Sequence, residues 1–385
     1  MIRVLHCVAG LGQGGAEKQL ALLCHATRNS VDHRIVAAGT ERFCYPGLPN
    51  PLPAVHDAGP ASPRDPRTVW KIVRVVREQQ PDILHCWLPS MNLLGGLAAR
   101  LNFQRRPAVL ASIRNVDDWK GPGRILADRI ASRLWDRILC NSQAGLACAR
   151  RQGLPDGKLY YVPNGLAERT RLTEAECGRL RAELGVPSRG VLLVSACRLV
   201  EQKRVDRLLA LMDELKAPFP QLRLAICGDG PWEARLRNEA AMRGLDGKVL
   251  FLGALDDPWP LLCAADALVM ASVREGSSNT LLEALQAGCV VFATDAGDNA
   301  FLVGEEAGWV GDWSALSGAL ARALESRELL ARFRAAAMMR ARAYSVERMA
   351  AGTLRHYEQL AVLARGADKQ AAAWEQEGQV GNAGR

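Results

Sequence analysis

Two glutamates eight residues apart, Glu275 and Glu283, stand in a segment whose residue types suit a polar, anionic ligand. Glu275 comes shortly after the apolar run 267–270, where a buried strand would end and a turn begin. Ser277 and Ser278 are N-cap candidates for a helix that would contain Glu283. Backbone N–H groups at a helix N-terminus attract phosphate, and carboxylates accept hydrogen bonds from sugar hydroxyls. The alternative interpretation is a capped surface helix with two solvated glutamates.

A glycine-rich loop at residues 10–15 could do a different chemistry. Gly10, Gly12 and Gly15 satisfy Gly-x-Gly-x-x-Gly after a first apolar strand, a pattern typical of NAD(P)-dependent oxidoreductases. That fingerprint requires an acidic residue at the end of the second strand, where this chain reads Val-Ala-Ala-Gly-Thr and Glu41 comes late. No His/Asp or Tyr/Lys catalytic set accompanies the loop, so the oxidoreductase hypothesis is the weaker one.

Length and composition indicate an ordinary globular protein of two domains. The chain has 385 residues, 49% hydrophobic and 23% charged. Eleven cysteines are scattered along it, mostly in or beside apolar runs, without Cys-x-x-Cys pairs or Cys/His clusters at metal-ligand spacing. We interpret them as small buried hydrophobic residues in a reducing compartment. No signal sequence and no apolar stretch long enough to span a bilayer is evident, so we expect a cytoplasmic protein, at most attached peripherally to the inner face of a membrane.

Positive charge gathers in the first half of the chain. Residues 1–165 contain 22 Lys and Arg against 12 Asp and Glu, a formal +10, whereas the remainder contains 27 against 29, a formal −2. Arg67, Lys71 and Arg74 share one face of a predicted helix, with Val69, Trp70, Val73 and Val76 expected on its apolar side. Such a helix suits an anionic membrane surface, and the alternative is an ordinary solvated face. No nucleic-acid recognition motif is present.

Short apolar strands alternate with amphipathic helices throughout, which predicts an α/β fold with parallel sheets covered on both faces. The predicted strands are 3–8, 32–38, 83–86, 108–113, 137–140 and 159–162 in the first half, and 191–196, 222–227, 249–252, 267–270 and 290–293 in the second. The predicted helices are 17–26, 66–79, 91–101, 125–135, 142–152 and 173–184, then 205–215, 232–243, 259–264, 279–287 and 313–325. Two doubly wound domains facing each other across a cleft fit this pattern, with ligands at the carboxyl ends of the strands.

Several motifs of the second half resemble one enzyme family. The Glu275–Glu283 segment resembles the Glu-x7-Glu element of retaining GT-B glycosyltransferases of family four, the group 1 glycosyltransferases. Residues 195–203 resemble the family's "GRL-x-x-x-K" element, with Cys197 in place of the usual glycine and Arg204 where a glycine usually follows the lysine. Residues 227–231 resemble its "GDGP" turn, and Leu252-Gly253 its "fLG" loop.

The first half carries further matches, and one departure. The loop at 10–17 resembles the family's "GLGxGGAE" loop, and residues 81–87 resemble its "PDVVHAH" strand, with Trp87 at the second histidine. Many members place a histidine near the reacting sugar after the fourth strand, where this chain has Arg114. An arginine there would face sugar hydroxyls or a diphosphate and does not act as a base at neutral pH. His85 and Arg114 are therefore candidates for the acceptor or sugar side of the site.

The resemblance, which covers residues 4 to about 360, implies a retaining hexosyltransferase. It would move a sugar from a nucleotide diphosphate sugar to a glycan or lipid-linked acceptor in polysaccharide or lipopolysaccharide assembly. Arg198 and Lys203 would neutralise the leaving diphosphate, and Glu275 would hydrogen-bond the sugar; these three are the expected catalytic residues. The expected donor-binding residues are Gly14, Gly15, Gly253, Gly276, Ser277, Ser278, Asn279 and Glu283, with Glu283 on the ribose. No metal and no cofactor is expected beyond the nucleotide sugar as co-substrate, and no Asp-x-Asp motif appears.

The resemblance also implies a division of labour along the chain. An acceptor-binding Rossmann-like domain over 1–168 would be completed by a C-terminal crossover helix at 345–362, and a donor-binding Rossmann-like domain would span 172–342. Residues 366–385, rich in Ala, Gln, Glu and Gly, are predicted to form a disordered tail. A third hypothesis is a nucleotide-sugar binding protein without catalysis.

Overall fold

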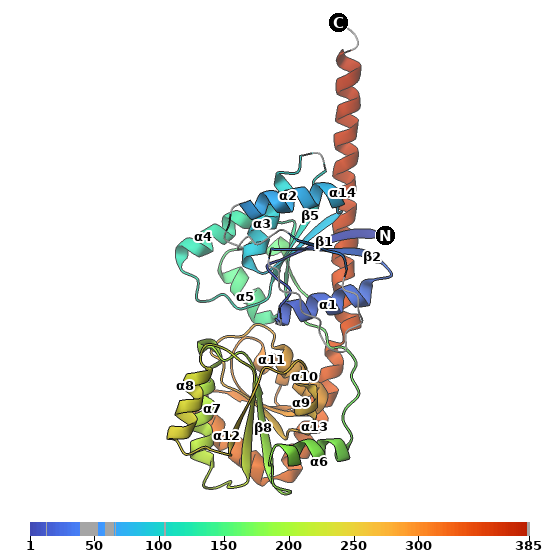
Figure 1. Ribbon diagram of the computed structural model, residues 1–385. Coiled ribbons are helices and arrows are strands. Elements are labelled where there is room, and N and C mark those ends of the chain that lie inside the picture. The colour runs from blue at the N-terminus through green and yellow to red at the C-terminus, as the bar shows by residue number, and fades with distance from the viewer. Residues whose placement is uncertain (13, 39–52, 58–64, 66, 104, 383–385) are drawn as a thin grey trace. The chain divides into compact units, whose positions relative to one another are not determined.

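The computed structural model describes residues 1–12, 14–38, 53–57, 65, 67–103 and 105–382. The chain divides into two compact units (Figure 1). Unit 1 comprises Met1–Gly165 and Val346–Arg385, and unit 2 comprises Leu166–Ser345. The boundaries predicted from the sequence are 168–172 and 342–345. Gln13 of the glycine-rich loop, Glu41 and Pro66 lie outside the described residues.

Unit 1 is built on a parallel sheet of seven strands in the order β3-β2-β1-β4-β5-β6-β7. The chain winds outward in one direction from β1 to β3 and in the other from β4 to β7, so the strand order reverses between β1 and β4. The strands are β1 Ile2–Val8, β2 Val31–Ala37, β3 Val55–Asp57, β4 Ile83–Trp87, β5 Ala108–Ile113, β6 Arg137–Cys140 and β7 Leu159–Tyr161. A ligand crevice is expected at the carboxyl ends of the strands on either side of such a reversal.

Helices cover both faces of this sheet, because its strands are apolar on both sides (Figure 1). They are α1 Gly15–Thr27, α2 Arg67–Gln79, α3 Pro89–Arg100, α4 Pro122–Ala131, α5 Gln143–Arg151 and α14 Val346–Asn382. The Ser142 side chain caps α5 by accepting a hydrogen bond from the Gly145 N–H. Helix α14, the long red helix of Figure 1, returns from unit 2 to pack against α1, β4 and β5.

Unit 2 repeats the plan with a parallel sheet of six strands in the order β10-β9-β8-β11-β12-β13. The strands are β8 Val191–Ala196, β9 Leu222–Cys227, β10 Val249–Gly253, β11 Ala267–Met270, β12 Val290–Thr294 and β13 Gly308–Gly311. The helices are α6 Glu174–Glu183, α7 Val205–Leu215, α8 Glu233–Met242, α9 Trp259–Ala264, α10 Asn279–Ala287, α11 Asn299–Val303, α12 Trp313–Glu325 and α13 Arg327–Ala341. Two apolar clusters, one on each face of the sheet, form the core.

The structure contains four elements that the sequence did not predict, and it also differs from the expectations for Trp70 and for residues 366–385. Strands β3 and β13 and helices α11 and α13 were not predicted, since the strands are only 3 and 4 residues long and α13 buries only Ala337 and Ala341. Trp70, expected on the apolar side of α2, is 63% exposed. Over 366–385, where the sequence predicts disorder, the structure extends helix α14 to Asn382. Ala, Gln, Glu and Lys are frequent in that stretch, and they are good helix formers.

The ten cysteines within the described residues are all free, eight of them buried and Cys177 and Cys197 partly so. None of the described helices combines the length and apolar character that crossing a bilayer requires.

Candidate active site

Two loops of unit 2 are hydrogen-bonded to each other at the carboxyl end of its sheet. The 3-10 turn Glu201–Lys203 follows β8, and the loop 271–278 follows β11, the neighbouring strand. The Val273 N–H donates to the Gln202 carbonyl oxygen at 3.0 Å, and the Gln202 side chain donates to the Arg274 carbonyl oxygen at 2.7 Å. The backbone contacts therefore fix the side chains of Lys203 and Glu275 near each other.

Lys203 and Glu275 form an ion pair across these loops. The Lys203 Nζ lies 2.5 Å from Glu275 Oε1, although the two residues are 72 positions apart. The Glu275 side chain is 8% exposed and that of Lys203 is 20% exposed, so the pair is largely withdrawn from solvent. Two of the three residues expected from the sequence to be catalytic thus meet in one site.

Arg198, the third, follows β8 and is exposed. Within the described part of the chain its side chain forms no ion pair or hydrogen bond, so the guanidinium is available to a ligand. The backbone beside it is tightly packed. A Cβ on Gly228 would lie 1.9 Å from the Cys197 carbonyl oxygen, and one on Gly230 would lie 2.5 Å from that of Leu199. The "GDGP" turn therefore supports the loop that carries Arg198, which is a structural role.

Helix α10 starts directly beside Glu275 and presents its N-terminus at the same edge of the sheet. The Ser278 side chain accepts a hydrogen bond from the Leu281 N–H at 3.3 Å, which makes Ser278 the N-cap. Of the two predicted candidates, Ser278 is thus the one that caps. Gly276 is buried, and its carbonyl oxygen accepts from the Asp298 N–H at 3.0 Å. The partial positive charge of the helix N-terminus therefore lies next to Lys203 and Glu275.

The segment 295–299, to which the sequence analysis gave no role, packs against this turn. A Cβ on Gly297, whose φ is +60°, would lie 2.3 Å from the Glu275 carbonyl oxygen. Only a glycine permits this approach of the two backbones, and it keeps the Glu275 turn in place.

Glu283 lies in α10 and is buried, 6% exposed. A hydrogen-bonded Asp257 carboxylate raises the pKa of the Arg169 side chain, and the negative charge of Glu283 acts in the same direction. The Arg169 guanidinium forms a bidentate pair with Asp257, at 2.8 and 2.5 Å, and stacks over the Trp259 ring at 4.8 Å. The sequence did not predict the pairing of Arg169 with Asp257, because no motif or periodicity links positions 88 apart.

Gly253, at the end of β10, has a φ of +71° and accepts a hydrogen bond from the Gly228 N–H at 2.7 Å. No atom lies within 4 Å of where its Cβ would be, so the backbone there faces open space. This is compatible with the backbone contact to a ligand expected at this position.

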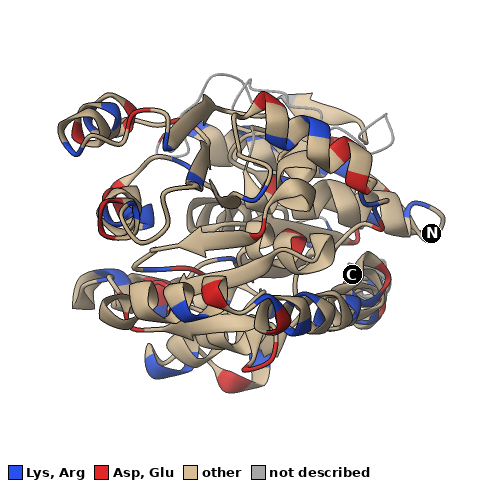
Figure 2. Cartoon of the chain, turned by 90° about the horizontal axis from the view of Figure 1, so that it is seen from below, with Lys and Arg blue, Asp and Glu red and all other residues tan. Residues whose placement is uncertain are grey.

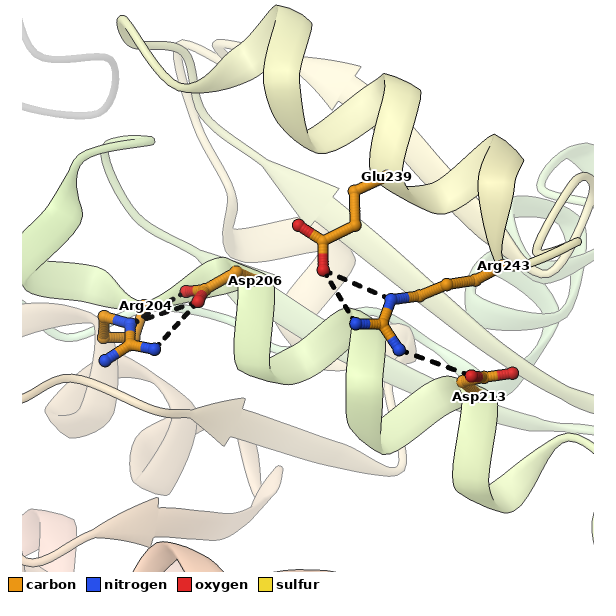
Figure 3. Close-up of polar contacts among 5 residues, drawn as sticks. All are labelled: Arg204, Asp206, Asp213, Glu239 and Arg243. Carbon is orange, nitrogen blue, oxygen red and sulfur yellow. Dashed lines mark hydrogen bonds and ion pairs between the residues drawn. The ribbon is translucent and has the colours of Figure 1, made fainter.

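Arg204 shows how the chain accommodates the missing glycine after Lys203. Its φ and ψ are both 46°, the left-handed conformation that favours glycine. The guanidinium grips the Asp206 carboxylate at 2.9–3.2 Å, as Figure 3 shows. The same figure shows Arg243 bridging Glu239 of α8 and Asp213 of α7, which ties together the two helices that follow.

In unit 1, the glycine-rich loop leads into α1. Gly14 is the N-cap residue and Gly15 the first residue of the helix. A Cβ on Gly14 would lie 2.0 Å from Glu17 Oε2, so that side chain folds back over the loop, and burial raises the pKa of Glu17. Gln19 exchanges two hydrogen bonds with the backbone of Gly165, at 2.9 and 2.8 Å. Helix α1, which follows the loop, is therefore anchored to the point where the chain leaves unit 1.

His85 is a packing residue of the sheet. It is fully buried, and its ring nitrogens contact the Tyr357 hydroxyl at 2.7 Å and the Ser112 hydroxyl at 2.8 Å. Burial lowers its pKa well below the usual value. Both nitrogens are occupied inside the core, where His85 joins β4 to helix α14, and its role on the acceptor or sugar side stays a prediction.

A chain of hydrogen bonds runs beside His85 with a fixed direction. An indole N–H only donates, so the Trp87 Nε1–H bond to His6 Nδ1, at 3.1 Å, places the His6 proton on Nε2. His6 then donates to His33 Nδ1 at 2.9 Å, and His33 Nε2 donates to the Thr27 hydroxyl at 2.7 Å. Thr27 donates in turn to the Leu23 carbonyl oxygen at 2.7 Å.

These hydrogen bonds determine the protonation of a His–Cys cluster that the spacing of the residues in the sequence did not reveal. In the described residues, potential ligand atoms of His6, Cys24 and His33 lie within 4.8 Å of one another. However, His6 Nε2 carries a proton, and burial raises the pKa of the Cys24 thiol far above its usual value. In this structure the three side chains therefore form a hydrogen-bonded cluster in the core.

Comparison with known proteins identifies the family. Residues 178–340 match the family "Glycosyl transferases group 1", and residues 13–168 match "Glycosyltransferase Family 4". Together these two matches cover most of both units. The chain belongs to the group 1 glycosyltransferases, with the GT-B fold. The matches do not favour the oxidoreductase hypothesis.

Relatives and solved structures agree with this assignment. The glycosyltransferase is 28% identical over 262 residues to the lipopolysaccharide core biosynthesis glycosyltransferase LpsE of Rhizobium meliloti, covering 66% of this chain and 68% of LpsE. It is 26% identical over 264 residues to the putative glycosyltransferase EpsD of Bacillus subtilis, covering 63% and 69%. Its fold is similar to that of Anabaena HepE in complex with UDP and glucose, at a TM-score of 0.79, 18% identity and coverage of 92% and 100%.

Proposed function

We propose that this glycosyltransferase moves a sugar from a nucleotide diphosphate sugar to a glycan or lipid-linked acceptor, with retention of configuration and without a metal. The observation that carries the proposal is the ion pair of Lys203 and Glu275 at the edge of the unit 2 sheet where α10 begins, with the exposed Arg198 on the same loop as Lys203. Two cations and a helix N-terminus suit a diphosphate, and a carboxylate beside them suits sugar hydroxyls.

Each group has a separate task in the proposed reaction. The bond between the sugar C1 and the diphosphate oxygen breaks, and the electron pair leaves with the diphosphate. Arg198 and Lys203 stabilise the negative charge that grows there, and Glu275 hydrogen-bonds the sugar as it gains positive character. The acceptor hydroxyl forms the new bond to C1 on the same face, and a phosphate oxygen takes its proton. Glu283 holds the ribose, in the donor-binding unit 2.

Relatives support the choice of substrates. HepE has been solved with UDP-glucose, and LpsE and the O-antigen biosynthesis glycosyltransferase WclY bear names that place them in lipopolysaccharide assembly. By analogy, unit 1 would bind a polysaccharide or lipopolysaccharide acceptor. The absence of an Asp-x-Asp motif from the sequence supports metal independence.

A donor panel tests the proposal directly. The full chain would be titrated with UDP and GDP by calorimetry, and slow hydrolysis of UDP- and GDP-sugars would be followed with and without EDTA. Binding of one nucleotide and EDTA-insensitive release of a sugar that keeps its anomeric configuration, read by proton NMR, is the expected result. Release of the opposite anomer would refute retention, and loss of turnover in EDTA would refute metal independence.

Attachment to a membrane surface is a second part of the proposal. In α4 only Ala131 is buried, whereas Leu126 and Ile130, one turn apart, are 56% and 57% exposed. Trp119, just before the helix, is 50% exposed, and the Arg124 guanidinium lies over its ring at 5.0 Å. Apolar side chains among cations are what an interfacial helix presents to anionic lipid.

The basic face of α2 is weaker than its sequence indicates. The exposed Arg67 is paired with Asp65 at 2.8 Å, and Arg74 with Glu78 at 2.7 Å. Figure 2 shows the same interleaving of basic and acidic residues on the helices generally. We therefore assign the membrane contact to α4, with the α2 cations as an electrostatic supplement.

Vesicle co-sedimentation separates the two helices. With vesicles of phosphatidylcholine and phosphatidylglycerol at low salt, L126Q with I130Q should reduce binding at least about tenfold, because two half-exposed apolar side chains no longer insert. Reversal of Arg67, Lys71 and Arg74 to glutamate should reduce binding in a salt-sensitive way, at about 1 kcal/mol per charge near the surface. Wild-type protein that ignores anionic vesicles at low salt would overturn membrane attachment.

A further inference from the structure

Arg114 carries a positive charge that no carboxylate neutralises within the described part of the chain. It directly follows β5, and its guanidinium lies over the Trp87 ring at 4.2 Å. One nitrogen, Nη1, donates to the Asn164 side-chain oxygen at 3.1 Å. The Nε atom is buried and has no hydrogen-bond partner. The contacts of the guanidinium are thus neutral, and part of its donor capacity is unused.

Other partly buried arginines of unit 1 are placed differently. Arg105 is paired with Asp82 at 2.9 Å, and Arg106 with Asp136 at 3.2 Å. A guanidinium removed from water is normally paired, since the loss of hydration is otherwise uncompensated. Burial lowers the pKa of Arg114 to about 10, so the side chain keeps its charge at neutral pH in spite of this cost. An anion bound at this position would therefore supply the charge partner that the dehydrated guanidinium lacks.

The surroundings of Arg114 also offer a free acceptor. The Asn141 side-chain nitrogen donates to the same Asn164 oxygen at 3.2 Å, and the Asn141 side-chain oxygen is buried without a partner. A guanidinium that lacks an anion and an amide oxygen that lacks a donor therefore share one neighbour, Asn164. A sugar bearing an acidic group provides both complements, an anion and hydroxyl donors.

The position in the fold is that of a ligand site. Trp87 ends β4 and Arg114 follows β5, two adjacent strands at the carboxyl edge of the sheet, next to the point where the strand order reverses. Leu88, between Trp87 and α3, has a φ of +72°, so the backbone there adopts a conformation that costs energy for a leucine. This strained backbone position directly follows Trp87, whose ring contacts the Arg114 guanidinium.

We propose that Arg114 binds a carboxylate or phosphate group on the acceptor sugar and thereby selects an acidic acceptor. The Trp87 ring backs the guanidinium, Asn164 orients its fork, and the Asn141 oxygen accepts from a hydroxyl of the same ring. The identification of the ligand as an acceptor rests on the proposed function, whereas the anion site itself rests on the geometry of unit 1.

Calorimetric titration of the full chain with D-glucuronate, inorganic phosphate and D-glucose tests the site. We expect glucuronate to bind at least about tenfold more tightly than glucose, as a charge-assisted bidentate contact should. R114Q should bring glucuronate and phosphate down to the level of glucose, and R114K should retain part of the preference. The exposed Arg133, changed to Gln, serves as the matched control and should leave all three affinities unchanged.

N164D gives a sharper test, because it keeps the accepting oxygen and supplies Arg114 with an internal carboxylate. This variant should remain folded, with an unfolding midpoint no lower than that of the wild type, and should still lose the preference for glucuronate. Equal affinity of the wild type for glucuronate and glucose, or an undiminished preference in R114Q or N164D, would overturn the proposal.

Titration with UDP separates the acceptor from the donor as the source of the anion. R114Q should change the affinity for UDP by less than about twofold, whereas E283A should lower it by tenfold or more. A tenfold loss of UDP affinity in R114Q would place the anion on the donor and refute an acceptor site. Failure of the wild type to bind any nucleotide would refute the proposed donor, yet the glucuronate result for Arg114 would stand or fall by itself.

Discussion

In the proposed reaction Arg198 and Lys203 both stabilise the leaving diphosphate, yet the structure predicts that their loss has different consequences. Arg198 is exposed and without an ion-pair partner in the described residues, so R198A should change the free energy of unfolding by no more than about 0.5 kcal/mol. K203A removes the partner of a carboxylate that is only 8% exposed. A buried group left unsatisfied costs about 1–3 kcal/mol and a charged one more, so we take about 2 kcal/mol as the lower bound for this partly accessible carboxylate.

For a unit of this size, about 2 kcal/mol corresponds to a fall in Tm of roughly 4–8 °C. Turnover should fall about 100-fold or more in each variant, because each cation meets charge that grows only in the transition state. Differential scanning calorimetry and release of sugar from the donor are the two measurements. The double variant of Lys203→Ala and Glu275→Gln should recover most of the lost stability, since no unpaired charge remains, but no activity.

Two results would refute this reasoning. If K203A is as stable as R198A, the ion pair of Lys203 and Glu275 does not contribute in solution. If R198A and K203A both keep turnover within a few-fold of the wild type, the diphosphate is held by other groups.

Three further predictions follow from buried or strained residues. E283A should weaken UDP binding by about 1.5–3 kcal/mol in calorimetry, because a carboxylate to the ribose hydroxyls is a charge-assisted contact; unchanged affinity in a folded variant would remove Glu283 from the site. The pKa of His33 falls to about 4 on burial, below its unfolded value near 6.5, so stability is complete above pH 6.5 and decreases by up to about 3 kcal/mol towards pH 4. Urea titrations should show a shallower decrease for H33Q, and equal slopes would contradict the assignment. R204A should be about 1 kcal/mol less stable than R204G, since both lose the pair with Asp206 but only alanine is strained at a φ of 46°; equal urea midpoints would show that the strain is negligible.

The sequence predicted the elements whose apolar pattern is uninterrupted. Strands 108–113, 137–140, 191–196 and 267–270 and helices 205–215 and 279–287 agree with the structure to the residue, because each is bounded by a glycine, a proline or a capping residue or ends abruptly in polarity. Short edge strands such as β13, with four residues at the end of the sheet, have too little apolar pattern to be seen.

The candidate site was predictable in part for a similar reason. Motifs mark positions where a strand ends, and parallel topology brings those ends together, so Lys203 and Glu275 could be expected to be neighbours. The contacts of Arg169, Arg114 and His85 depend on residues 88, 50 and 272 positions away, respectively. No local pattern encodes such pairings. These pairings determine how exposed each side chain is, and the exposure decides whether the side chain can bind a sugar or only packs in the core.

Unit 1 is assembled from both ends of the chain, and this has a consequence for synthesis on the ribosome. The Tyr357 hydroxyl that satisfies His85 belongs to α14, which is translated after all of unit 2. During elongation, residues 1–165 therefore lack the helix that contacts His85 and covers part of their sheet. The contiguous residues 166–345, by contrast, already possess all the strands of unit 2. We expect the second unit to become protease-resistant on the nascent chain before the first, so a stop codon shortly before α14 would leave a folded unit 2 attached to an incomplete unit 1.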